Sequence, residues 1–125
     1  MLTLGEGTRV YLACGHTDLR KSIDGLAALV SPQSDLGTPV FQLDLFSNSL
    51  FVFCNRGRDK LKILVWDHNG FWLYYRRLER GRFRWPEQPG QKTLTVTRRQ
   101  LQWLLDGLTL EQQQAHAPVT ARIAV

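Results

Sequence analysis

Residues 50–78, LFVFCNRGRDKLKILVWDHNGFWLYYRRL, decide the fold that the sequence predicts. Three runs rich in β-branched and aromatic residues are separated by short polar segments with Gly, Asn and Asp, a pattern typical of consecutive antiparallel strands. In the second connection, Asn69 and Gly70 are expected to supply the positive φ angles of a tight hairpin. We therefore expect an antiparallel meander over roughly 50–85, with strands at 50–54, 61–66 and 71–78 and a short segment at 83–85 that Pro86 ends.

A helix is expected on each side of this meander. Residues 18–30 form one apolar stripe at helical spacing, and Thr17 is a plausible N-cap. The second helix follows Thr97, because Thr97 and Gln100 have the spacing of a capping box. The apolar positions are Leu19, Ile23, Leu26, Ala27 and Val30 in the first helix, and Leu101, Leu104, Leu105 and Leu108 in the second, which Gly107 ends.

The predicted fold class is α+β: an antiparallel β-meander of about four to five strands packed with two α-helices. A further strand is expected at 8–14, and the segment 31–48 reads either as a loop or as a short strand. Residues 1–110 are expected to form a single domain, followed by a flexible C-terminal tail over 111–125 that contains Pro118.

Composition excludes several classes of protein. The chain has 125 residues, of which 43% are hydrophobic and 22% charged, which is ordinary for one globular domain with its own core. The apolar runs are far shorter than the roughly 20 residues of a membrane span, and the first residues do not resemble a secretory signal. We therefore expect a cytoplasmic protein without a membrane partner. Cys14 and Cys54 are interpreted as reduced core thiols, although the sequence alone leaves a disulfide open.

Positive charge is concentrated in the centre of the chain. The net charge is +5, but residues 56–99 hold twelve Lys and Arg against four Asp and Glu. A folded basic surface attracts polyanions, and nucleic acid is the first partner to consider. The alternative is a solvated surface that keeps the protein soluble. The candidate nucleic-acid-binding residues are Arg56, Arg58, Lys60, Lys62, Arg76, Arg77, Arg80, Arg82, Arg84 and Trp85.

Aromatic residues in the last strand raise a second question. Strand alternation puts Phe71, Leu73 and Tyr75 on one face and Trp72, Tyr74 and Arg76 on the other. If the helices cover only the first face, the second could stack unpaired bases, together with Trp85. The interpretation that we favour from sequence is that both faces are buried and these aromatics belong to the core.

No residue pattern indicates catalysis or a cofactor. The possible ligands Cys14, His16, Cys54 and His68 do not have the spacing of a structural zinc site. The acidic residues form no paired motif beside the basic stretch. We therefore expect neither a metal nor another cofactor, and a protein that is not an enzyme.

Four stretches carry a resemblance to known proteins: TDLRKSIDGLAALV (17–30), LFVFCNRGRDKLKIL (50–64), KLKILVWDHNGFWLYYRRLERGRFRWP (60–86) and LTVTRRQLQWLLDGL (94–108). Together they resemble a family, the small accessory protein of bacterial insertion sequences of the sixty-six type. That protein is the product of the second open reading frame and is often labelled a transposase component. In this family the turn after the strand at 50–54 usually reads N-R-R-G-D, whereas residues 55–59 of this sequence read NRGRD.

The resemblance implies a non-catalytic helper of transposition, because a separate, larger transposase carries the catalytic residues. It supplies no established catalytic residue for this chain. Our first hypothesis is an accessory factor that binds DNA, either element ends or target, through its basic turns. The alternatives are a subunit that docks onto the transposase of the same element through its aromatic face and Trp103, and a module for single-stranded nucleic acid. Self-association into a homo-oligomer is also left open.

Overall fold

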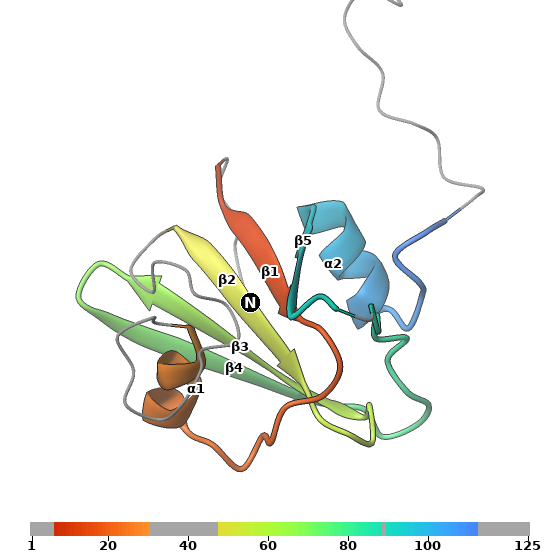
Figure 1. The fold of residues 1–125 in the computed structure, drawn as a ribbon, viewed down its shortest axis with the longest axis horizontal. Coiled ribbons are helices and arrows are strands. Elements are labelled where there is room, and N and C mark those ends of the chain that lie inside the picture. The colour runs from red at the N-terminus through yellow and green to blue at the C-terminus, as the bar shows by residue number, and fades with distance from the viewer. Residues whose placement is uncertain (1–6, 31–47, 89, 113–125) are drawn as a thin grey trace, which may run out of the picture.

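A five-stranded sheet forms the centre of the protein, and the two helices pack against it (Figure 1). The computed structural model describes residues 7–30, 48–88 and 90–112. Within these residues the sheet has the strand order β4-β3-β2-β1-β5. In chain order the elements are β1 (Arg9–Ala13), α1 (Ile23–Val30), β2 (Ser49–Cys54), β3 (Lys60–Asp67), β4 (Gly70–Arg77), β5 (Thr93–Val96) and α2 (Arg98–Leu105).

The predicted α+β class and the antiparallel meander are confirmed. Strands β2, β3 and β4 follow one another in antiparallel order, with Leu50 opposite Val65 and Lys60 opposite Arg77. The sheet is nevertheless mixed, because β1 pairs with β2 in parallel while β5 pairs with β1 in antiparallel. The expected short segment at 83–85 is not a strand.

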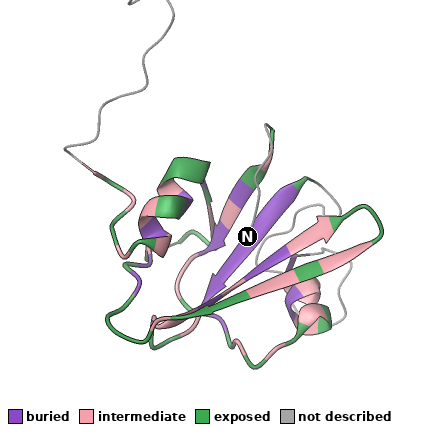
Figure 2. Ribbon diagram, turned by 180° about the vertical axis from the view of Figure 1, so that it is seen from behind, coloured by how far each residue is buried: buried purple, intermediate pink, exposed green. Residues whose placement is uncertain are grey.

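Burial follows from this order. Strand β2 lies in the middle of the sheet and is buried at all six positions (Figure 2). Its near-continuous apolar sequence is typical of a strand covered on both faces. Strand β4 is at the edge of the sheet, and none of its residues is fully buried.

Alternation along the strands divides the core into two clusters on opposite faces. On one face, Leu26 and Val30 of α1 pack with Phe51, Phe53 and Leu64. On the other face, which we call the α2 face, leucines of α2 pack with alternate strand residues and with Phe83 and Trp85. The α2-face cluster includes Val10, Leu12, Leu50, Val52, Leu61, Ile63, Leu101 and Leu104.

Helix α1 is shorter than predicted. It begins at Ile23, and not at Asp18. The side chain of Asp18 accepts a hydrogen bond from the backbone N–H of Arg20, which makes a local turn there. Thr17 lies six residues before the helix, so it is not its N-cap; it is buried, and its backbone N–H donates to the carbonyl of Cys54.

The β3–β4 hairpin is also built differently from the prediction. Its loop has two residues, His68 and Asn69, since Asp67 pairs with Gly70. The residue with positive φ is His68, at 56°, and not Asn69 or Gly70 as expected.

Two expectations fall on residues outside the described ranges: the loop or strand within 31–48, apart from Asn48, and the tail after Gln112. Among the described helices, none is long and apolar enough to cross a membrane.

Candidate nucleic-acid interface

Two basic segments that are far apart in the sequence lie side by side at one end of the sheet (Figure 1). They are the β2–β3 turn, residues 55–59, and the segment that follows β4, residues 78–84. The backbone N–H of Leu78 donates to the carbonyl of Asp59 at 2.7 Å, and that of Phe83 donates to the carbonyl of Arg58 at 2.7 Å. Together with the pairing of Lys60 and Arg77, these bonds hold the two segments against each other.

We call the cations gathered here the basic end of the sheet. All of them are exposed except Lys60, which is half-buried. Within the described residues only Arg77 has an acidic partner, because its guanidinium lies 2.9 Å from Glu79. The basic end consists of Arg56, Lys60, Arg76, Arg77, Arg80, Arg82 and Arg84.

These cations surround the end of the sheet and do not share one face. Lys60 lines a hollow on the face of α1. Arg76 is the neighbour of Arg77, which pairs with Lys60, so the side chain of Arg76 projects from the opposite face of the sheet. Arg76 lines a second surface, on the α2 face, next to the end of α2 at Leu105 and Asp106. Arg80, Arg82 and Arg84 line that same surface.

Arg58 ties the two segments together. It adopts a positive φ of 60°, donates from Nη1 to the carbonyl of Trp85 at 3.0 Å, and forms an ion pair with Glu87. Its side chain is only 23% exposed. The guanidinium that the sequence assigned to phosphate is thus already engaged within the protein.

The β2–β3 turn is shaped by Asn55. Its side-chain oxygen accepts hydrogen bonds from the backbone N–H groups of Asp59 and Lys60, both at 3.1 Å. Its side-chain amide donates to Asp59 Oδ1 at 2.8 Å, and this hydrogen bond holds the pKa of the Asp59 carboxyl below its usual value. Asp59 is therefore a built-in anion beside the basic end.

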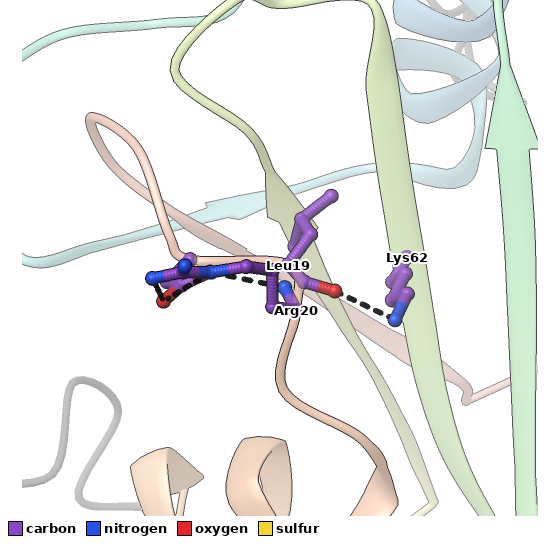
Figure 3. Close-up of polar contacts among 4 residues, drawn as sticks. Leu19, Arg20 and Lys62 are labelled. Atoms are coloured by element: carbon purple, nitrogen blue, oxygen red, sulfur yellow. Dashed lines mark hydrogen bonds and ion pairs between the residues drawn. The ribbon is translucent and has the colours of Figure 1, made fainter.

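Lys62, like Arg58, binds backbone carbonyl groups inside the protein. Its Nζ donates to the carbonyl of Leu19 at 2.7 Å (Figure 3). It also donates to the carbonyl of Lys21 at 3.1 Å. The side chain is half-buried and fastens the segment before α1 to the sheet. Like Arg58, Lys62 was expected to contact nucleic acid, and the structure gives it a contact inside the fold.

Trp85 does not have the accessible position that we expected for a nucleic-acid-binding residue. Its ring is 6% exposed, and its Nε1 donates to the carbonyl of Ala13 at 2.8 Å. A base cannot stack on a ring that is enclosed in the core. Trp72 differs from expectation in the opposite direction: the sequence favours a core position and leaves an exposed one open, and the ring is 56% exposed. It stacks on half-buried Tyr74 with ring centroids 6.2 Å apart.

A hollow on the α1 face was not predicted from the sequence. The hollow on the α1 face, which we call the basin, has a volume of about 890 Å³ and is lined by Arg20 and Tyr75 as well as by Arg56, Lys60 and Lys62. The signal for Tyr75 was present: a two-residue loop at 68–69 fixes the register that puts Tyr75 opposite Lys62. The sequence contains no such local signal that would place Arg20 at the basin.

Metal-ligating side chains do not cluster in the described parts of the chain. No group of three or more His, Cys, Asp and Glu residues there is close enough to hold a metal ion. Cys14 and Cys54 are both free thiols, and burial raises the pKa of Cys54 to about 11.

Comparison with known proteins gives a consistent result. The family described as IS66 Orf2 like protein matches residues 8–115, which extends past the stretches that carry the resemblance in the sequence. In Sinorhizobium fredii (strain NBRC 101917 / NGR234), the "Uncharacterized protein y4hO" is 36% identical over 114 residues, 91% of this chain and 92% of that protein. In the same organism, the "Uncharacterized protein y4jC" is 30% identical over 86 residues, 69% of this chain and 68% of that protein.

No solved structure matches the chain. The family match covers most of the sequence and includes every described helix and strand. The chain therefore belongs to the IS66 Orf2-like family, whose role is that of an accessory protein associated with transposition.

Proposed function

We propose that the protein binds DNA through the basic end of the sheet as an accessory factor in transposition. The observation that carries the proposal is the pair of backbone hydrogen bonds, Leu78 to Asp59 and Phe83 to Arg58, that holds two basic segments together. Six arginines are thereby presented on a fixed framework. Arginine suits phosphate because its planar guanidinium can donate two parallel hydrogen bonds to phosphate oxygens.

The local charge balance supports this role. Five of these arginines have no ion pair within the described chain, so their charge is not offset by a neighbouring carboxylate in contact. Binding of this kind is mainly electrostatic and releases counterions from DNA, which makes the affinity fall steeply with salt. Phosphate contacts position a protein on DNA but do not read its sequence.

The test is fluorescence anisotropy of the purified chain with a labelled duplex at several salt concentrations. We expect tight binding at low salt, weakening steeply as salt is added. A duplex with the terminal sequence of the element is compared with a scrambled duplex, and the ratio of the two affinities reports whether ends are recognised. Absence of binding to either duplex at low salt would refute the proposal.

A charge-removal series identifies the surface. Replacing Arg80, Arg82 and Arg84 together with Ala should reduce the slope of log affinity against log salt by about three, because each arginine that pairs with a phosphate adds about one to that slope. Arg9→Ala is the matched control, because Arg9 is an exposed cation at the opposite end of the sheet, beside Ser49. An unchanged slope in the triple variant would place the DNA elsewhere.

Docking onto the transposase of the same element is the second candidate function. It is favoured by the exposed ring of Trp72, which with Tyr74 forms an aromatic surface on the edge strand. Aromatic residues are enriched at protein interfaces. Trp103, the other residue considered for docking, is half-buried and lies 5.0 Å below the Arg99 guanidinium. Trp72→Ala should weaken co-purification with the transposase while leaving DNA affinity unchanged.

A further inference from the structure

The basin on the α1 face has the charge of an anion-binding site. Four cationic side chains and one carboxylate line it. The carboxylate, Asp18, already forms a bidentate ion pair with Arg20, whose Nε and Nη2 lie 2.9 Å and 2.8 Å from its oxygens. That hydrogen bonding keeps the pKa of Asp18 well below its usual value, so the pair is internally neutral. The charges of Arg56, Lys60 and Lys62 remain.

The basin also contains an exposed aromatic ring. Tyr75 is 55% exposed, an unusual degree for a tyrosine on a strand whose neighbours on the same face, Phe71 and Leu73, pack into the core. Lys62 Nζ lies 5.8 Å from the centre of the ring. A planar ring beside cations is the combination with which proteins bind unpaired bases, since the base stacks and the phosphate pairs with the cations.

The walls of the basin are held in place before any ligand arrives. Lys62 binds the carbonyl of Leu19 (Figure 3) and that of Lys21, and these bonds hold the wall formed by residues 16–20 against β3. Asn55 fixes the opposite wall through its bonds to Asp59 and Lys60. A prearranged site loses less freedom on binding than one that must be ordered by its ligand.

The size and position of the basin indicate which ligand it could hold. A volume of about 890 Å³ lies within the range of pockets that hold small molecules and is larger than one side chain could fill. The basin opens next to the basic end, with which it shares Arg56 and Lys60. The bases of an intact duplex are stacked inside the helix and cannot reach Tyr75, whereas the base of an unpaired nucleotide can.

We infer that the basin binds an unpaired DNA nucleotide, with the base stacked on Tyr75 and its phosphate paired with Arg56 and Lys60, beside a duplex held by the basic end. The inference rests on the proposed DNA binding and adds a preference for duplexes that carry a single-stranded extension. Trp72 and Tyr74, which lie on the other face, are not part of this site.

The experiment uses the full chain and one duplex sequence in three forms: blunt, with a four-nucleotide single-stranded extension, and with the same extension made of abasic sites. The extension is placed at the 3′ end in one set and at the 5′ end in another. We expect the extension of at least one polarity to tighten binding about tenfold over the blunt duplex, the effect of stacking a single base. The abasic extension should lose most of this gain.

Two variants decide whether the basin is responsible. Tyr75→Leu should abolish the gain from the extension while leaving affinity for the blunt duplex unchanged. Trp72→Leu is the matched control, because it removes an aromatic ring of almost equal exposure from the other face of the same strand. It should leave the gain intact. Far-ultraviolet circular dichroism of both variants confirms that each remains folded.

The possible outcomes separate this inference from the proposed function. Equal affinity for blunt and extended duplexes, or loss of the gain in Trp72→Leu and not in Tyr75→Leu, would overturn the inference and leave DNA binding standing. Failure to bind any duplex would overturn both. Release of the extended duplex by a free deoxynucleotide at equal concentration would also overturn it, because the basin would then be a mononucleotide site.

Discussion

Arg58 has an unfavourable backbone conformation, and contacts of its side chain offset part of the cost. Its φ of 60° is in the left-handed region, which is disfavoured by roughly 1–2 kcal/mol for a residue with a Cβ. The hydrogen bond to the carbonyl of Trp85 and the ion pair with Glu87 offset part of this cost. In the pattern N-R-R-G-D that the sequence resembles, glycine would stand at this position, and here Gly57 is its neighbour.

A comparison of two substitutions separates the backbone from the side chain at Arg58. Both Arg58→Ala and Arg58→Gly lose the bond to Trp85, but only glycine removes the cost of the positive φ. The glycine variant should therefore be the more stable of the two by about 1 kcal/mol, measured by urea unfolding. Arg56→Ala, exposed in the same turn, should stay within about 0.5 kcal/mol of the parent. Equal stability of the two Arg58 variants would contradict this account.

Cys54 should be unreactive in the folded protein. It is fully buried, and burial raises the pKa of its thiol to about 11, so almost no thiolate exists at pH 8. In a Cys14→Ser background, we expect a thiol reagent to label Cys54 slowly at pH 8 and quickly in concentrated urea. The native rate should rise with pH, because a raised pKa keeps the thiol protonated until the pH approaches it. Fast labelling of the folded variant at pH 8 would be inconsistent with a buried thiol.

At the scale of elements, helix α2 is defined at both ends by local contacts. Thr97 and Gln100 form the predicted capping box, with Thr97 Oγ1 accepting from the backbone N–H of Gln100 and the Gln100 side chain accepting from that of Thr97. At the other end, Gly107 donates to Leu104 and Leu108 donates to Trp103, with a φ of 82° at Gly107. This is the Schellman arrangement. Signals within a few residues made α2 predictable from sequence.

The N-terminal cap of α2 is open to a direct test. Thr97→Ala removes the side-chain acceptor of the Gln100 N–H and should lower the free energy of unfolding by about 1 kcal/mol. Thr97→Ser keeps the acceptor and should lose much less. Both values can be read from urea unfolding monitored by circular dichroism. A loss in Thr97→Ser equal to that in Thr97→Ala would show that the hydroxyl contributes little.

Other elements could not be predicted, because their causes are distant in sequence. Helix α1 starts at Ile23, and the segment before it is held by the bond from Thr17 to Cys54, a residue 37 positions away. The parallel pairing of β1 with β2 likewise depends on the path of the chain between them. Only local turns and periodicity are visible in a single sequence. Hence the three-stranded meander and a strand at 8–14 were predicted, whereas the parallel pairing of that strand with β2 and the strand β5 were not.

The candidate site was predictable to the same extent. The basic segments were identified from composition, and the hairpin register could have paired Lys62 with Tyr75. Which face each cation occupies depends on how the helices cover the sheet, and the sequence does not contain that information locally. Trp72 and Trp85 show this clearly. Both lie in aromatic, basic surroundings in the sequence, yet one is 56% and the other 6% exposed.

At the scale of the whole molecule, positive charge accumulates at the end of the sheet where the two basic segments meet. Glu79 and Glu87 are each paired with one arginine, Arg77 and Arg58. Asp59, which accepts a hydrogen bond from Asn55 and lies near Lys60 and Arg82, offsets only part of the remaining charge. The remaining cations of the basic end repel one another. Self-repulsion destabilises a compact state, and a bound polyanion relieves it. The charge on which the proposed DNA binding depends should thus make the free protein less stable.

This repulsion predicts that salt stabilises the protein in the absence of DNA. Raising the ionic strength from about 0.01 M to about 0.15 M shortens the screening length from about 30 Å to about 8 Å, which weakens repulsion among the arginines. We expect Tm, measured by differential scanning fluorimetry, to rise over this range. Replacing Arg80, Arg82 and Arg84 with Gln should raise Tm at low salt and flatten its salt dependence, whereas Arg9→Gln should do neither. A Tm that falls with salt would mean that ion pairs such as Arg20–Asp18, Arg58–Glu87 and Arg77–Glu79 outweigh the repulsion, and that the cations of the basic end do not destabilise the fold.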